Sequence, residues 1–281
     1  MNRKQCLLVV VGCLLLSGCS VKLMYNNMDR FVRWQVSDYV DLNREQREYL
    51  NQEVKAILTW HRANHLPLYA DTLSSFATQA TDQVSEEFLA DMFAQFFQWG
   101  DEVERRSLPI AIGVLQSLTD KQVNKLPERF EVSNLELAED ELEGDLIEHQ
   151  QRWGEEFEST LERFTGNLNK TQRGVIASQS KRYQPERLMW AEYRRNWQAD
   201  LLDLLVHRDK ETFPAQFQAL VKSRESYFSP EFQVVNDANQ KLGVELLSQV
   251  LNSLDDQQSE RFQRRINELA QDLRELSEKK S

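Results

Sequence analysis

The amino-acid sequence predicts an all-α protein, a multi-helix bundle of about ten helices. Glycine and proline are scarce, with 9 and 6 among 281 residues, whereas Leu, Glu, Gln and Arg, which favour helices, are abundant. Apolar residues recur every three or four positions along most of the chain, which is the spacing of one helix face. We find no segment that alternates apolar and polar residues as a half-buried strand would.

The first 18 residues have the order of a secretory signal peptide, in which a basic start precedes a short apolar run. Arg3 and Lys4 are followed by the apolar run 7–16, which is too short for a membrane-spanning helix of roughly 20 residues. The run ends in Leu16-Ser17-Gly18-Cys19, which resembles the bacterial lipobox. That resemblance implies cleavage between Gly18 and Cys19 and acylation of Cys19, with palmitate as a typical acyl group.

Residues 19–41 are therefore expected to be a lipid-anchored N-terminal segment, with the membrane as a partner through lipid on Cys19. Ser20 follows the cysteine, and this resembles the pattern that sorts lipoproteins to the outer membrane. We expect the periplasmic face of that membrane. Cys6 and Cys13 leave with the signal peptide, so the mature chain has no disulfide in an oxidising compartment. Its stability must come from a hydrophobic core, which its length permits.

Residues 42–281 are expected to form a single all-helical domain. Apolar stripes predict helices before Pro67, from Phe88 onward, across 142–164 and over 262–276. Five prolines are predicted to stand in first turns, where the missing N–H costs little. They are Pro67, Pro109, Pro185, Pro214 and Pro230.

A pentad of leucine, capping residue, two polar residues and glutamine occurs four times. The copies span Leu42 to Gln46, Leu118 to Gln122, Leu168 to Gln172 and Leu254 to Gln258. Each fits a capping box, in which the cap accepts from the N–H three residues on and the glutamine returns to the N–H of the cap. The sequence therefore predicts caps at Asn43, Thr119, Asn169 and Asp255, paired with Gln46, Gln122, Gln172 and Gln258.

The order of the pentads predicts an internal duplication. The first and third copies each stand at the start of a long segment, and the second and fourth copies each stand at the end of one. Val-Leu-x-Ser-Leu precedes the second copy, and Val-Leu-Asn-Ser-Leu precedes the fourth. The predicted halves span about 42–131 and 168–270, with a bridging helix over 135–165. The competing interpretation is chance pairing, because helical segments look alike in composition.

Several short motifs resemble the opening of an uncharacterised family of Gram-negative lipoproteins, a domain of unknown function. They are Tyr25-Asn26-Asn27, Val32-Arg33-Trp34, Asp38 to Leu42, Gln46, Trp60-His61-Arg62 and Leu66-Pro67-x-Tyr69. The resemblance covers nearly the whole chain and implies the lipid anchor and an all-helical fold, but no activity. The second pentad also resembles the LTxxQ hallmark of the Spy and CpxP periplasmic chaperones. Convergent helix capping is the alternative explanation for that pentad.

Charge and motif content exclude several functional classes. The formal net charge is −11, and it becomes −13 once Arg3 and Lys4 leave with residues 1–18. Such a chain repels nucleic acid, so we expect no nucleic-acid partner. Nucleophile signatures and phosphate-binding glycine loops are absent from the sequence, and we predict neither catalytic residues nor a cofactor.

His61 and His65 are four residues apart on one predicted helix, a spacing that can hold zinc. His61 lies on the apolar face beside Trp60 and no His-Glu-x-x-His motif is present, so we interpret both as structural and predict no metal site. The leading hypothesis is a non-enzymatic interaction or chaperone-like accessory protein whose envelope partner the sequence does not name. The alternative is an enzyme or a protein that binds a small ligand, metal or glycan near Trp60, His61, His65 and Asp71.

Overall fold

The computed structural model describes residues 18–80 and 83–279, without the side chains of residues 18–20, 140 and 141. Residues 1–17 of the predicted signal peptide, which spans 1–18, lie outside the described residues. The described part of the chain forms thirteen α-helices and two short 3₁₀ helices, with no strand. The all-α prediction is confirmed. None of the described helices combines the length and the apolar character needed to cross a bilayer.

The helices fall into two series that follow one another along the chain. The first series is α2 (Gly18–Asn26), α3 (Met28–Tyr39), α4 (Arg44–Asn64), α5 (Leu66–Gln79), α6 (Glu86–Gln116), α7 (Asp120–Val123) and α8 (Leu126–Leu142). The second series is α9 (Leu146–Thr165), α10 (Lys170–Gln179), η1 (Ser180–Arg182), α11 (Arg187–Leu205), α12 (Phe213–Lys222), η2 (Arg224–Tyr227), α13 (Pro230–Leu251) and α14 (Asp256–Glu278).

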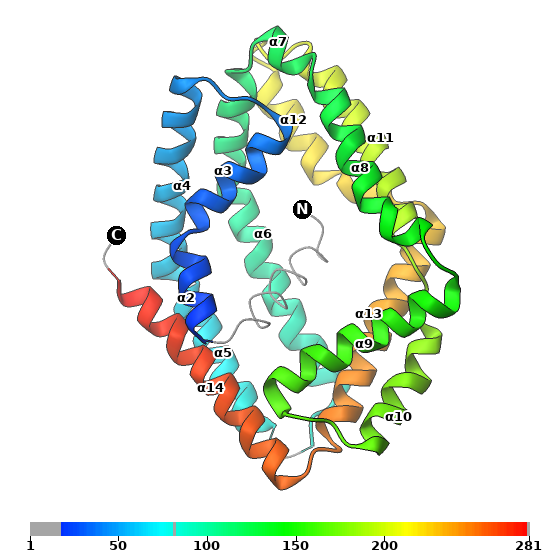
Figure 1. Ribbon diagram of the computed structural model, residues 1–281. Coiled ribbons are helices and arrows are strands. Elements are labelled where there is room, and N and C mark those ends of the chain that lie inside the picture. The colour runs from blue at the N-terminus through cyan, green and yellow to red at the C-terminus, as the bar shows by residue number, and fades with distance from the viewer. Residues whose placement is uncertain (1–17, 81–82, 280–281) are drawn as a thin grey trace.

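These helices are arranged as a frame (Figure 1). In the view of Figure 1, α3 and α4 form its left side, α7 and α12 lie at the top, and α8 and α11 form the upper right side. The lower right side contains α9, α10 and α13, and the lower left side contains α5 and α14. The long helix α6 contacts α4, α12 and α13. The frame is therefore closed by contacts between segments far apart in the sequence.

The two series exchange their last helices. The last helix of the first series, α8, packs along α11 of the second, and α14 packs along α5 of the first. In each series the helix before the first pentad, α3 or α9, contacts both the helix that follows it and the last helix of its own series. These equivalent contacts are what a duplicated chain predicts. The equivalent contacts begin at α9, before the predicted boundary at residue 168, and the duplication itself stays a prediction.

The buried apolar residues form four clusters, and the two largest contain both series. The first cluster joins α2, α5 and the start of α6 to α14. The second joins the end of α6, α7 and α8 to α11 and α12. The smaller clusters lie between α9, α10 and α13 and between α4 and α6. Burying one large apolar side chain contributes about 1.5–3 kcal/mol, so the exchanged helices bind the two series into one folded body.

The bridging helix expected over 135–165 is wrong. The chain turns at Glu143–Asp145, where Gly144 has a φ of 105°, a conformation that favours glycine. Asp145 then caps α9 and forms a capping box with Glu148. Both signals can be read in the sequence, because Asp-x-x-Glu after a glycine is a helix start. The apolar stripe assigned to one helix across 142–164 therefore belongs to two.

The expectation for Pro109 is also wrong, because this residue lies inside α6. An internal proline loses one backbone hydrogen bond and crowds the preceding turn. The neighbours Leu108, Ile110 and Ile112 pack into the second and fourth clusters, so tertiary packing outweighs the local penalty. Pro67, Pro214 and Pro230 lie in first turns as predicted, and Pro185 lies two residues before α11.

Candidate functional site

Each of the four pentads begins a helix with a capping box. The boxes cap α4, α7, α10 and α14 through Asn43, Thr119, Asn169 and Asp255. At the first of them, Oδ1 of Asn43 accepts from the N–H of Gln46 at 3.0 Å, and Oε1 of Gln46 accepts from the N–H of Asn43 at 2.8 Å. This arrangement uses only one end of the glutamine amide, and its Nε2 group remains available for a longer-range contact.

The box glutamines use that second end to join the pentads in pairs. Nε2 of Gln46 donates to the carbonyl oxygen of Ser117 at 2.6 Å, and Nε2 of Gln122 donates to the carbonyl oxygen of Asp41 at 2.8 Å. Each Nε2 also donates to Oε1 of the other glutamine, at 3.2 and 2.8 Å. We call this arrangement the first glutamine clamp. It holds the start of α4 against the turn between α6 and α7.

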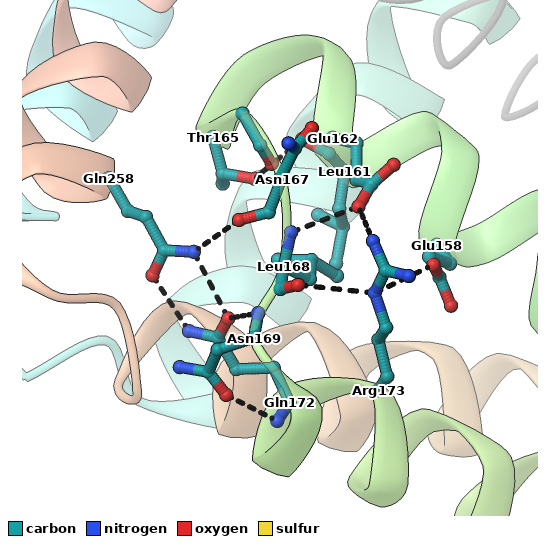
Figure 2. A network of polar contacts seen from close by, with 11 residues as sticks. Glu158, Leu161, Glu162, Thr165, Asn167, Leu168, Asn169, Gln172, Arg173 and Gln258 are labelled. Atoms are coloured by element: carbon teal, nitrogen blue, oxygen red, sulfur yellow. Dashed lines mark hydrogen bonds and ion pairs between the residues drawn. The ribbon is translucent and has the colours of Figure 1, made fainter.

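The second glutamine clamp repeats these bonds in the second series (Figure 2). Nε2 of Gln172 donates to the carbonyl oxygen of Ser253 at 2.9 Å, and Nε2 of Gln258 donates to that of Asn167 at 2.9 Å. The two amides bond to each other at 2.8 and 3.1 Å. In both clamps the accepting carbonyl belongs to the residue two positions before the partner cap. The sequence predicted the four caps but not their pairing across the fold.

The clamps are buried structural elements. Gln46, Gln172 and Gln258 are buried at 4%, 1% and 7% exposure, and Gln122 is half-buried. A buried amide must be hydrogen-bonded, because an unsatisfied buried group costs about 1–3 kcal/mol. Both ends of each glutamine amide are satisfied within its clamp, so these residues stabilise the corners of the frame and leave little capacity for a ligand.

The two histidines of the alternative hypothesis lie together at the junction of α4 and α5. Their rings are parallel, with centroids 5.2 Å apart and an interplanar angle of 3°. Nδ1 of His61 lies 2.8 Å from the hydroxyl of Tyr25, and its Nε2 lies 3.2 Å from the hydroxyl of Tyr69. One ring nitrogen donates and the other accepts, so His61 joins α2 to α5.

His65 is 1% exposed and packs edge-on against Trp60, with ring centroids 4.6 Å apart. Its Nε2 lies 3.3 Å from a carboxylate oxygen of Glu102, but neither ring nitrogen has a well-aligned hydrogen bond within the described residues. The proposed ligand position Asp71 lies elsewhere. Its carboxylate is exposed and pairs with Arg274 at 3.1 Å. The structure therefore does not assemble the four residues of the alternative site.

Burial keeps both imidazoles neutral. The pKa of His61 is lowered to about 4, first by removal of the ring from water and second by the neighbouring His65. Burial likewise lowers the pKa of His65, while Glu102 opposes that shift. Among the described residues no group of three or more His, Cys, Asp or Glu side chains could hold a metal ion. The arrangement is that of a structural histidine pair with one unsatisfied member.

A pocket of about 300 Å³ adjoins the first glutamine clamp. It is lined by Tyr39, Val40, Asp41, Lys121, Gln122, Lys125 and Arg129. The carboxylate of Asp41 pairs with Lys125 at 3.3 Å and with Arg129 at 3.7 Å, so two of the three cations in the lining share one carboxylate and the lining keeps a positive charge. No sequence motif indicates this pocket, because its residues meet only when the turn before α4 packs on α7 and α8.

The predicted lipidation site is partly described. The backbone of Gly18 and Cys19 lies in the first turn of α2, and their side chains lie outside the described set.

Comparison with known proteins gives one match. A family with the description "Family of unknown function (DUF6279)" matches residues 38–233. No curated protein and no solved structure matches the chain.

Proposed function

The chain belongs to DUF6279, a family of unknown function, and we propose that it is a non-enzymatic lipoprotein that holds a helical frame at the periplasmic face of the outer membrane. In this role it acts as an interaction or accessory protein of the cell envelope. Its lipid is carried by Cys19, and its partner is another envelope protein.

The observation that carries the proposal is the short connection between Cys19 and the folded body. Val21 lies two residues after the cysteine, is 2% exposed and belongs to the largest buried cluster. Nζ of Lys22 lies 2.6 Å from carboxylate oxygens of both Asp272 and Glu275 on α14. Tyr25, one turn further, reaches His61. A lipid on Cys19 would therefore hold the whole frame close to the bilayer, without a flexible linker.

The use of polar side chains within the fold supports a structural role. The four box glutamines bond to one another and to backbone carbonyls, and both ring nitrogens of His61 face tyrosine hydroxyls. Among these groups, only His61 belongs to the alternative site that the sequence suggested. A protein built in this way presents a fixed surface to a partner.

The chaperone-like form of this role would need a large exposed apolar surface, larger than the few hundred Å² usual for a monomer. The aromatic residues of α6 do not supply one. Phe96 is buried, Phe88, Phe93 and Trp99 pack against the first cluster, and Phe97 is half-buried. We therefore propose a tethered scaffold and expect equimolar protein to leave the aggregation of unfolded clients unchanged. Suppression across several clients would restore the chaperone-like role.

Lipid attachment is tested by labelling cells with palmitate analogues and fractionating the envelope. The wild-type protein should take up label and remain with membranes after a carbonate wash. Cys19→Ala should take up no label and should accumulate as an uncleaved or soluble product. Ser20→Ala keeps the cysteine and is the matched control for acylation. An unlabelled wild-type protein would refute the lipoprotein assignment.

The alternative function, a ligand or metal site at the histidine pair, is favoured by the unsatisfied ring of His65. Zinc titration with thermal unfolding separates the two hypotheses. A bound metal would add about 2.7 kcal/mol at a hundredfold excess over its dissociation constant. The proposed function predicts almost no change in melting temperature. A large increase that His65→Ala abolishes would replace it with the metal-site hypothesis.

A further inference from the structure

The segment that follows Cys19 exposes three large apolar side chains. Leu23, Phe31 and Trp34 are 67%, 47% and 57% exposed, and the rings of Phe31 and Trp34 contact each other at a centroid distance of 5.8 Å. None of the residues of α3 is buried. Exposed apolar residues are ordinary when scattered, but a contiguous group marks a surface that another phase or molecule covers.

These residues form one stripe because α2 and α3 are almost continuous. The N–H of Asn27 bonds to the carbonyl of Leu23 at 3.2 Å, and the N–H of Phe31 bonds to the carbonyl of Asn27 at 3.0 Å. Within α3, at 100° per residue, Trp34 lies about 40° from Arg30 and about 60° from Phe31 around the helix axis. Leu23 is exposed on α2, which meets α3 at Asn27. We call Leu23, Arg30, Phe31 and Trp34 the outer stripe.

The opposite side of the same two helices is packed on the protein. Val21 and Tyr25 belong to the first buried cluster, and Val32 and Val36 pack against the cluster between α4 and α6. A helix that is apolar on two sides needs a cover for each. The body of the protein covers the inner side, and the outer stripe requires a second apolar environment.

We propose that the outer stripe lies in the interfacial region of the lipid bilayer, so that α2 and α3 rest on the membrane beside the acylated cysteine. This inference rests on the proposed lipid attachment. Leu23 is one helical turn, about 6 Å, from Cys19, so acyl chains on Cys19 bring the stripe to the bilayer surface. Tryptophan favours the membrane–water interface, and Arg30 beside Trp34 can reach lipid phosphates while its stem stays in an apolar layer.

The position of the stripe would also orient the frame. In Figure 1, α2 and α3 lie on the left side, whereas the turn between α8 and α9 lies at the right edge. That turn carries Leu142, Leu146 and Ile147, which are exposed. A membrane-bound outer stripe would hold α2 and α3 at the bilayer and place this turn on the opposite side of the frame, away from the anchor.

The test uses purified acylated full-length mature protein in phosphatidylethanolamine and phosphatidylglycerol vesicles whose acyl chains carry bromine, which quenches nearby tryptophan. Wild-type protein should show a quenched component of its emission. Trp34→Phe should lose that component and keep the aromatic contact with Phe31. Trp153→Phe, which removes a half-buried indole of the third cluster, is the matched control and should keep it.

Two results would overturn the inference. One is equal quenching in wild type and Trp34→Phe. The other is a concentration-dependent dimer that Trp34→Phe abolishes, which would place a second copy on the stripe. Mass spectrometry of the N-terminal peptide separates this failure from that of the proposed function. An acylated protein whose Trp34 is not quenched refutes only the membrane-bound stripe, and an unacylated protein refutes the lipid anchor.

Discussion

The two glutamine clamps are made of the same bonds in different surroundings. The second clamp lies in the interior, where Gln172 and Gln258 are 1% and 7% exposed. It is supported by Arg173, which pairs with Glu158 and Glu162 beside it (Figure 2). The first clamp includes the half-buried Gln122, which lines an open pocket. The comparison separates what the motif determines from what its environment determines.

The motif determines the geometry, because a capping box places the second end of the glutamine amide outward from the helix start. Burial determines how much each clamp contributes to the free energy of unfolding. A hydrogen bond lost in the interior leaves its partners unsatisfied, whereas water replaces a bond lost at the surface. The two clamps should therefore look alike in structure and differ in their contribution to stability.

The largest effect is expected for Gln172→Leu. The substitution leaves the N–H of Asn169, the carbonyl of Ser253 and Oε1 of Gln258 without their bonds to Gln172. The bond to Gln258 is buried and the other two are part-buried, so at about 1–3 kcal/mol for an unsatisfied buried group the loss in free energy of unfolding should be about 3 kcal/mol. Gln122→Leu should cost about 1–2 kcal/mol, because water reaches that site. Denaturant unfolding of the mature protein measures both. Equal losses would show that burial does not distinguish the clamps.

The second prediction concerns the loss of stability at acid pH, because only the first series carries the buried histidine pair. The pKa of His61 is about 4 in the folded protein and about 6.5 in an unfolded chain. Between these values the unfolded state binds a proton that the folded state excludes. Stability present at neutral pH is therefore lost as the pH falls from about 6.5 to about 4. At about 1.36 kcal/mol per unit, the loss is roughly 3 kcal/mol.

Hydrogen exchange at pH 7 and pH 5 locates that loss. Relative to the intrinsic exchange rate at each pH, amides of α4 and α5 should lose more protection at pH 5 than those of α10 and α11. His61→Gln keeps a polar partner for the tyrosines but does not titrate, so it should flatten the pH dependence. His207→Gln, at an exposed position, is the control. An equal loss of amide protection in both series at pH 5 would contradict a local histidine effect.

A smaller effect is expected at the turn before the second clamp. Gly166 has a φ of 81°, a conformation that costs a residue with a side chain about 1–3 kcal/mol. The equivalent position before the first clamp is Val40, whose backbone is extended. Gly166→Ala should therefore lower stability by about 1–2 kcal/mol in denaturant unfolding. Gly243→Ala, in a helix with no atom within 4 Å of the new methyl, should be neutral or stabilising. A neutral Gly166→Ala would contradict the strain argument.

The smallest effect should come from the caps themselves. Asn169→Ala and Thr119→Ala each remove one side-chain bond to a backbone N–H, at 3.0 and 3.3 Å. A lost cap costs about 0.5–2 kcal/mol, and the longer bond of Thr119 places it at the lower end. Thermal unfolding of the two variants gives the comparison. A greater loss at Thr119 than at Asn169 would invert the expected ranking of the clamps.

The sequence predicted the features that depend on residues close together along the chain. Capping boxes involve residues three positions apart, so the helix starts at Asn43 and Asp255 could be read directly. The pairing of Gln46 with Gln122 could not, because those residues are 76 positions apart and meet only through the packing of α4 on α6. Asp71 was grouped with His65 by proximity along the chain, but its partner is Arg274, 203 positions away. The Asp145–Glu148 box was readable and was missed, because a continuous apolar stripe masked it.

The pentads act in pairs as clamps and not as four independent helix caps. Double-mutant cycles with Gln46→Ala and Gln122→Ala, and with Gln172→Ala and Gln258→Ala, measure whether the two glutamines of each clamp are coupled. Clamped pairs predict a coupling energy of about 0.5–3 kcal/mol in each cycle, larger in the second. The cross pair of Gln46→Ala with Gln172→Ala should be additive within about 0.5 kcal/mol. Additive losses within both clamps would contradict the claim.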